Sequence, residues 1–243
     1  MTIENFVILS IIGVLSVIQS FFGMGVLVFG TPTLLLMGYD FITTLGYLLP
    51  ASFAISLLQV LTSSSRKVPI SRYLYLLCLP GIGIGLWLTD ASSITSWTNR
   101  LVGGTLLLSA LVRFWSPSQR LVGVLLNRYL PIYHLIMGVT HGLTNLGGAL
   151  LAILASGRNN EKEVIRYTIA HYYLAFSSIQ MLLLATTMGH SLLLINNLST
   201  AIIAAIVYLF VGNRIFNNSN NQYYNFALSL FITAYGIAIL LRL

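Results

Sequence analysis

Charged residues and cysteine are the scarcest features of this 243-residue chain. Only 7% of the residues are charged, with twelve Lys and Arg and five Asp and Glu, while 57% are hydrophobic. Soluble domains carry about 25% charged residues, so this composition excludes an ordinary soluble globule. It predicts an all-α polytopic membrane protein. One cysteine, Cys78, excludes a disulfide or a thiolate metal site within one chain.

Enzyme motifs are also missing from the sequence. It contains no HExxH, no P-loop and no Gly-x-Ser-x-Gly pattern. His134 and His141 are two helical turns apart without a carboxylate nearby, which argues against a metal site. We therefore expect neither an enzyme nor a cofactor. The net charge of +7 comes from residues in short loops between apolar runs, which indicates a lipid bilayer as partner and not nucleic acid.

Charged and turn residues divide the chain into two sets of four apolar segments. The predicted division lies between 116 and 117. In repeat 1 (1–116) the segments are 5–38, 41–64, 69–89 and 97–115, and in repeat 2 (117–243) they are 129–157, 164–188, 190–213 and 222–242.

The two sets resemble each other in the order of their polar residues. The stretch "QSFFGMGVLV" parallels "HGLTNLGGAL", which pairs Gly23 with Asn145 and Gly25 with Gly147. Later, "FAISLLQVL" parallels "LAFSSIQMLLL". This second match pairs Ser56 with Ser177 and Gln59 with Gln180. Chance similarity between apolar helices is the alternative, but the matched order favours an internal repeat.

The distribution of basic residues favours inverted repeats. A helix over the uncharged run 5–39 would be about 50 Å long, against about 30 Å of hydrocarbon. If the first segment of each repeat crosses once, the basic residues divide seven to five between the two sides. If each enters and returns as a broken hairpin, ten lie inside and only Arg100 and Arg242 outside. The positive-inside rule favours the second topology. This topology has about 8–10 membrane segments and places both termini outside. We expect the protein in the plasma (inner) membrane.

The two hairpin tips, at residues 19–25 and 141–148, are the predicted binding site. We expect them to meet near the bilayer centre, where half-helix ends and polar groups hold an anion. Neither tip contains an acidic residue, so a small anion or zwitterion fits better than a metal cation. The tips contain glycines, which leave room for a ligand, and polar side chains, which can donate hydrogen bonds to it. The predicted site residues in the tips are Gln19, Ser20, Gly23, Gly25, His141, Thr144, Asn145, Gly147 and Gly148.

Other polar residues in the spans are candidates with structural alternatives. Ser56, Gln59, Ser177 and Gln180 either face the site or bond and pack against another helix. His141 either binds the anion or couples transport to protons, or it is a neutral histidine bonded to a carbonyl group. His171 is a second candidate for proton coupling.

Two stretches carry a resemblance to a known family. "GMGVLVFGTPTLLLMGYDFITTLGYLLPASFAISLL" and "MGVTHGLTNLGGALLAILASGRNNEKEVIRYTIAHYYLAFSSI" resemble the two motif copies of the TauE/SafE family of sulfite exporters. The resemblance implies a secondary transporter that exports sulfite or an organosulfonate by alternating access. A permease for another small solute or anion is the alternative, and homodimer formation stays open.

Overall fold

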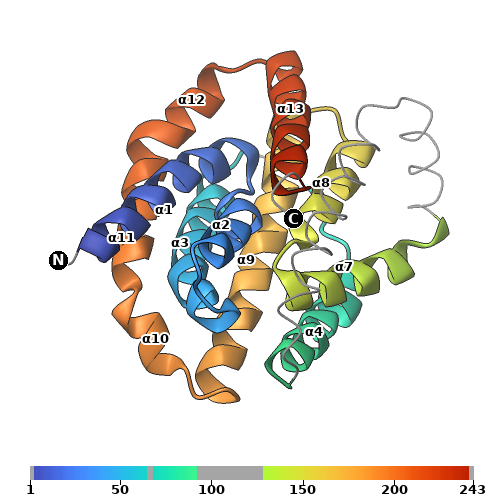
Figure 1. Ribbon diagram of the computed structural model, residues 1–243. Helices are drawn as coiled ribbons and strands as arrows, with labels where there is room; N and C mark the ends of the chain where they lie inside the picture. The colour runs from blue at the N-terminus through green and yellow to red at the C-terminus, as the bar shows by residue number, and fades with distance from the viewer. Residues whose placement is uncertain (1–2, 65–67, 92–127, 241–243) are drawn as a thin grey trace. The chain divides into compact units, whose positions relative to one another are not determined.

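The computed structural model describes residues 3–64, 68–91 and 128–240, and all regular structure in these ranges is helical (Figure 1). The predicted all-α class is confirmed. The predicted helix over 97–115 lies outside the described residues. The described helices form two compact units, Met1–Arg66 with Ala170–Ser219 and Lys67–Ile169 with Asn220–Leu243. This grouping rests on contacts and not on sequence equivalence, so the repeat boundary at 116/117 stays a prediction.

The first unit contains most of the long apolar helices. Its elements are α1 (Ile3–Phe22), α2 (Val26–Leu36), α3 (Phe41–Thr62), the second part of α9 (Lys162–Thr186), α10 (Ser191–Asn196), α11 (Leu198–Val207), the π-helical segment η2 (Tyr208–Gly212) and α12 (Asn213–Asn218). The turn expected before 190 is present, with Gly189 at φ 71°. The segment predicted over 190–213 is divided at Asn197 and continues to Asn218, and Arg214 within the continuation is exposed.

α3 and α11 run in the same direction. Tyr47, in the second turn of α3, and Thr200, at the start of α11, line one cavity. Toward the other end, the hydroxyl groups of Thr62 and Tyr208 form a hydrogen bond. The two helices therefore run parallel to each other.

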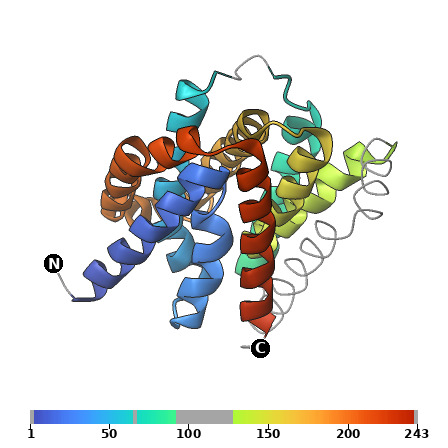
Figure 2. The same ribbon diagram turned by 90° about the horizontal axis from the view of Figure 1, so that it is seen from above.

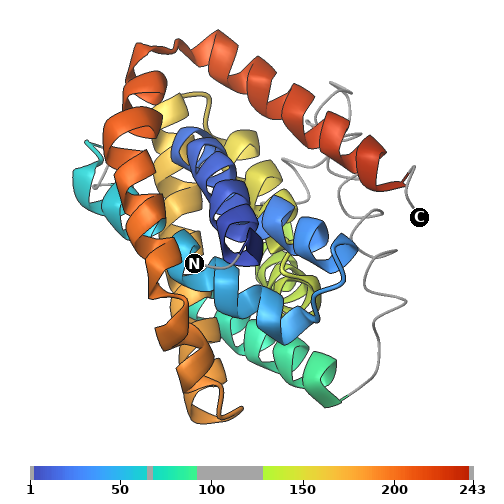
Figure 3. The same cartoon turned by 60° about the vertical axis from the view of Figure 1, so that its left-hand side comes forward.

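α1 follows the same direction beside them (Figure 3). Its residue Asn5 lines the cavity that Tyr47 and Thr200 also line. At its other end, Ser20 packs directly against Gly212 of η2, where a Cβ atom would overlap the serine side chain. The first unit thus contains three parallel helices, α1, α3 and α11 with η2, whose N-termini share one end.

The outer faces of the helices are apolar. Within the described ranges, four helical stretches have the length and composition to cross a membrane: Glu4–Phe22, Phe41–Thr62, Lys162–Thr186 and Leu198–Asn218. On the last of them, large apolar side chains are exposed at Leu198, Ile202, Ile206, Leu209 and Phe210. A surface of this kind is expected where a helix faces lipid, so the polytopic membrane class is confirmed.

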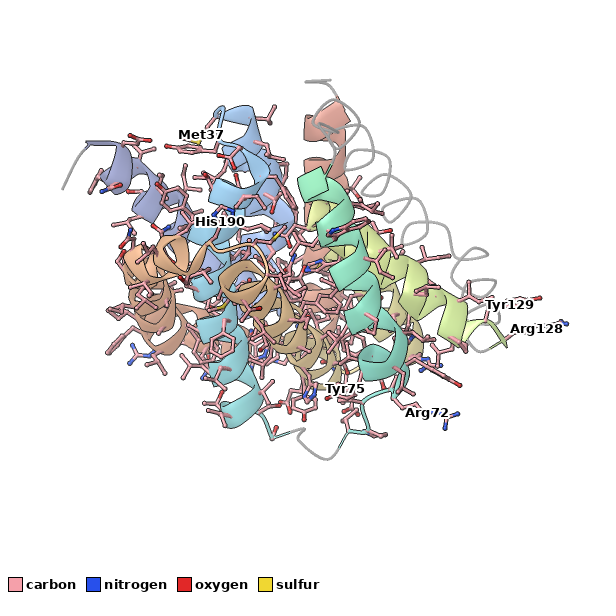
Figure 4. The ribbon with its side chains drawn as sticks, turned by 90° about the horizontal axis from the view of Figure 1, so that it is seen from below. Met37, Arg72, Tyr75, Arg128, Tyr129 and His190 are labelled. Carbon is pink, nitrogen blue, oxygen red and sulfur yellow. The ribbon has the colours of Figure 1, made fainter. Side chains whose placement is uncertain are left out.

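The second unit combines a packed helix pair with the second hairpin. Its elements are η1 (Leu74–Cys78, π-helical), α4 (Leu79–Ala91), α7 (Leu130–Thr144), α8 (Gly147–Arg158), the first part of α9 and α13 (Asn221–Leu240). Arg72 and Arg128 project from the N-terminal ends of the pair formed by η1–α4 and α7 (Figure 4), and each guanidinium lies over the ring of the next residue, Tyr73 or Tyr129.

α4 and α7 are parallel and touch through glycines. Gly81 and Gly85 of α4 face Gly138 and Gly142 of α7, so each helix presents small residues four apart. A Cβ atom at Gly85 would lie 2.5 Å from the carbonyl oxygen of Val139, one at Gly138 would overlap the carbonyl group of Cys78 in η1, and one at Gly142 would overlap that of Ile82 in α4. Gly81 and Gly85 thus allow the two helices to approach closely.

Candidate functional site

The first broken hairpin interrupts the helix at the predicted tip. α1 ends at Phe22 and α2 begins at Val26. Between them Gly23 adopts φ 83°, a left-handed conformation that glycine accepts without steric cost. Its N–H donates to the carbonyl of Gln19 over 2.7 Å, which closes the last turn of α1. The residues of the break are buried.

The chain then returns along α1 (Figure 2). A Cβ atom at Gly25 would lie 2.6 Å from the backbone nitrogen of Gln19, and one at Gly30 would lie 3.2 Å from Leu15. After α2, the Tyr39 hydroxyl donates to the Glu4 carboxylate at 2.6 Å. The hairpin therefore begins and ends at one side of the first unit, as the enter-and-return topology requires.

The two arms of this hairpin are unequal. α1 has 20 residues and α2 has 11. α1 stays helical to Phe22 because the hydroxyl of Ser20 bonds the carbonyl of Ser16 at 2.6 Å and Gln19 finds partners on α3. The tip consequently lies against the second half of α3.

Gln19 fastens the tip of the hairpin. Its amide nitrogen lies 3.1 Å from the carbonyl of Ser52, the hydroxyl of Ser52 and the hydroxyl of Ser56. Its amide oxygen accepts the N–H of Val26 at 3.0 Å. Gly25, the N-cap residue of α2, has no side chain to do this. Gln19 thus caps α2 and ties it to α3.

Gln59 holds the same tip from the other side. Its amide nitrogen donates to the carbonyls of Gln19 and Ser20, at 3.0 and 3.1 Å, which are acceptors in the last turn of α1. Two carbonyl partners fix the amide orientation, since only the NH₂ group can donate to them. The structure therefore brings together four predicted residues, Gln19, Ser20, Ser56 and Gln59.

The second hairpin breaks at the residue that the repeat alignment pairs with Gly23. α7 ends at Thr144, and Asn145 adopts φ 63° before α8 begins at Gly147. The N–H of Asn145 donates to the carbonyl of His141 at 2.7 Å, the same bond that Gly23 makes to Gln19. Asparagine is among the few residues that tolerate this conformation. The two tips are locally equivalent.

This hairpin also returns on itself. The Tyr133 hydroxyl, on α7, donates to the carbonyl of Leu150, on α8, at 2.6 Å. A Cβ atom at Gly147 would lie 2.6 Å from Cβ of His141, so α8 starts in contact with the buried histidine. Thr144 accepts the N–H of Leu146 at 3.2 Å and supports the turn. Gly148, the second residue of α8, is also buried.

The remaining predicted residues lie on α9. Ser177 is buried and donates to the carbonyl of Tyr173 at 2.7 Å. Gln180 is buried, and His171 is half-buried. By contacts these three residues belong to the first unit, whereas the second tip belongs to the second unit. That the two tips meet around one ligand stays a prediction.

Several residues around the first tip were not predicted from the sequence. Ser52 lies one helical turn before Ser56 and shares its face, so helical spacing could have found it. Gly212 and Tyr208 belong to a π-helical segment, which nothing in the apolar pattern of 190–213 signals. Polar residues at the start of α1 and α11 were also missed because they lie beyond the tips.

The family model described as "Sulfite exporter TauE/SafE" matches residues 8–239, which is nearly the whole chain and includes both broken hairpins. Neither the curated proteins nor the solved structures compared with the chain gave a match. The extent of the family match is sufficient to conclude that this chain belongs to the TauE/SafE sulfite exporter family.

Proposed function

We propose that the protein is a secondary transporter that exports a small sulfur-containing anion, of the sulfite or organosulfonate type. Two inverted repeats alternate the access of one central site between the two sides of the plasma (inner) membrane, with both termini outside. The family membership supports the substrate class. The proposed site residues are the two hairpin tips, with Ser56, Gln59, Ser177 and Gln180 on the helices that follow them.

The matched breaks of the two hairpins carry this proposal. Gly23 and Asn145 both leave the helix with positive φ, and both close the preceding turn with a bond of 2.7 Å. Irregular backbone in a membrane protein is tolerated where protein or a polar cavity surrounds it, and transporters use such breaks to bind ions and substrates. Neither tip contains a carboxylate, which supports an anion as the ligand.

Proton coupling through His141 or His171 forms a second part of the proposal. The repeat alignment places His141 at the position of Gln19, whose amide cannot titrate near neutral pH. His141→Gln therefore keeps a hydrogen-bonding side chain and removes the proton site. In this variant we expect the anion to continue to move down its concentration gradient, but the flux no longer responds to an imposed pH gradient. The same substitution at His171 separates the two candidates.

Flux into and out of liposomes tests the function directly. Purified protein is reconstituted and loaded with sulfite, thiosulfate, ethanesulfonate or sulfate, and release is followed with and without a membrane potential. We expect release of at least one reduced-sulfur or sulfonate anion. If none of these anions moves while an unrelated solute does, the alternative of a permease for another solute replaces the proposed substrate class.

A further inference from the structure

A cavity of about 270 Å³ lies in the first unit, at the level where two membrane spans begin. Asn5 in its wall is the second residue of the span Glu4–Phe22, and Ser199 is the second residue of the span Leu198–Asn218. The ends of membrane spans lie at the depth of the lipid headgroups, so the cavity lies at that depth as well. No predicted site residue belongs to its lining, which consists of Asn5, Ile8, Leu9, Tyr47, Asn196, Asn197, Ser199 and Thr200.

Three polar side chains of the wall are available to a ligand. The amide of Asn197 and the hydroxyl of Thr200 donate to backbone carbonyls of their own helical turns, at 2.9 and 2.8 Å. The side chains of Tyr47, Asn196 and Ser199 make no hydrogen bond within the described residues. Their amide and hydroxyl oxygens can accept hydrogen bonds. The wall therefore offers several free acceptors around one small volume.

The charged residues of the first unit divide between its two ends. Its sequence contains four Asp, Glu, Lys or Arg residues, namely Glu4, Asp40, Arg66 and Arg214. Glu4 lies in the first turn of α1 and Asp40 caps α3, so both carboxylates are at the end that holds the cavity. Arg66 follows the C-terminus of α3 in the sequence, and Arg214 lies on α12. Within this unit, the charge at the cavity end favours a cationic group over an anion.

Glu4 lies beside the cavity wall. It precedes Asn5 and is one helical turn before Ile8, and both of these residues line the cavity. One of its carboxylate oxygens accepts the Tyr39 hydroxyl at 2.6 Å, and the centroid of the Tyr39 ring is 5.8 Å from that of Tyr47, which is also in the wall. Glu4 is exposed, and a carboxylate can accept further hydrogen bonds. It can therefore attract an ammonium group that lies against this wall.

Exposed apolar side chains surround the outer part of the wall. Ile195 directly precedes Asn196, and Leu198 directly precedes Ser199. Ile202 follows on α11, one helical turn after Leu198. All three apolar side chains are exposed, as expected where a membrane span faces hydrocarbon. A molecule with its polar group in the cavity would therefore have an apolar surface beside it for a hydrocarbon chain.

We propose that the cavity binds the headgroup of a membrane phospholipid with a primary ammonium group, of the phosphatidylethanolamine type. The ammonium group donates hydrogen bonds to the side-chain oxygens of Asn196 and Ser199 and is attracted by the carboxylate of Glu4. The phosphate stays at the membrane surface, and an acyl chain lies along Leu198 and Ile202. Phosphatidylcholine has no N–H group to donate, and the carboxylate repels the net negative charge of phosphatidylglycerol. The site therefore prefers phosphatidylethanolamine to both, whichever solute the protein transports.

Lipid binding to the delipidated full chain in detergent tests the site. Native mass spectrometry measures the affinities for phosphatidylethanolamine, phosphatidylcholine and phosphatidylglycerol with identical acyl chains. Glu4→Gln keeps an acceptor for Tyr39 and removes the charge. We expect phosphatidylethanolamine to bind this variant about threefold more weakly, as for an exposed ion pair, and phosphatidylglycerol to bind it more tightly. Asn196→Leu removes one hydrogen bond to a charged group and is expected to weaken phosphatidylethanolamine binding about tenfold.

Matched substitutions outside the lining serve as controls. Glu161→Gln and Asn217→Leu make the same chemical changes at exposed positions, and both are expected to bind the three lipids like the wild type. Thermal unfolding verifies that all four variants are folded.

Three outcomes overturn the proposal. The first is equal affinity of the wild type for the three lipids, and the second is unchanged phosphatidylethanolamine affinity in both Glu4→Gln and Asn196→Leu. The third is displacement of the lipid by free phosphoethanolamine at the same concentration, which would assign the cavity to a soluble amine and leave the apolar side chains beside it without a role in binding.

Discussion

At the scale of single residues, two glutamines hold the first hairpin tip in place through hydrogen bonds. Gln19 caps α2 and reaches α3, while Gln59 reaches back to the end of α1. A polar side chain in an apolar span costs free energy unless it is hydrogen-bonded. Here each glutamine supplies hydrogen-bond partners that the ends of the interrupted helix lack. Of the two interpretations given for Gln59, the structure shows the bond to another helix, and its role in a binding site stays a prediction.

Replacing Gln19 tests how much this network contributes to stability. Gln19→Leu leaves the buried N–H of Val26 without its acceptor, which costs about 1–3 kcal/mol. We expect a lower thermal unfolding temperature in detergent. Gln222→Leu, at an exposed position at the start of α13, is the matched control and is expected to unfold like the wild type. Equal unfolding temperatures for the two variants would contradict the role of Gln19 as a cap.

At the scale of elements, the N-terminus of α3 depends on Asp40. Its carboxylate accepts the N–H of Thr43 at 2.9 Å. Burial acts to raise the pKa of Asp40, but hydrogen bonds from Thr43 and the backbone outweigh it, so the pKa is lower than the ordinary 3.8. The charged form is therefore favoured in the folded state. Its contribution is present above the unfolded-state pKa and is lost as the pH falls through the lower folded-state value.

Substitution and acid titration test this cap together. Asp40→Ala is expected to destabilise α3 by about 0.5–2 kcal/mol, the usual cost of losing an N-cap. Asp40→Asn keeps an acceptor for Thr43 and is expected to lose little stability at neutral pH. As the pH falls below the unfolded-state pKa, the wild type is expected to lose stability that Asp40→Asn, which has no carboxylate to protonate, retains. A parallel pH dependence in both proteins would refute the contribution of the carboxylate.

The contact between α4 and α7 is a second feature of this scale. Gly142→Ala would place a methyl group against a backbone carbonyl of α4, which cannot yield as a side chain does. We expect a loss of about 1–3 kcal/mol, as for overpacked interiors. Gly13→Ala on α1 adds the same group where no atom lies within 4 Å, and it is expected to be neutral or stabilising. Circular dichroism during heating of both variants would reveal the difference.

Particular elements show how far the sequence predicts this fold. The break at Gly23 and its counterpart at Asn145 were predictable because flexible and polar residues interrupt apolar runs at aligned positions. The extension of α1 to Phe22 was not, since it depends on Ser52 and Ser56, more than thirty residues away. The cavity was also beyond sequence reasoning. It forms where the start of α1, the second turn of α3 and the junction of α10 with α11 come together, and no local pattern records such an arrangement.

At the scale of the whole molecule, the orientation in the membrane can be measured with one reactive group. Cys78 is the single cysteine and is buried, so we expect it to react little with thiol reagents. We expect Asn159→Cys to react only from the cytoplasmic side and Met37→Cys, at the exposed position labelled in Figure 4, only from outside. Labelling of Asn159→Cys from outside would restore the parallel arrangement and exclude inverted repeats.

The hydrogen bond between Tyr39 and Glu4 has a consequence for biogenesis. The bond joins the two ends of the first hairpin, so in the proposed topology residues 4–39 add no net crossing to the nascent chain. In that topology we expect the direction of every later helix to be independent of the hairpin. A chain synthesised from Asp40 onward would insert α3 and its successors in unchanged directions, so this hairpin could have been gained or lost in evolution without inverting the rest of the protein.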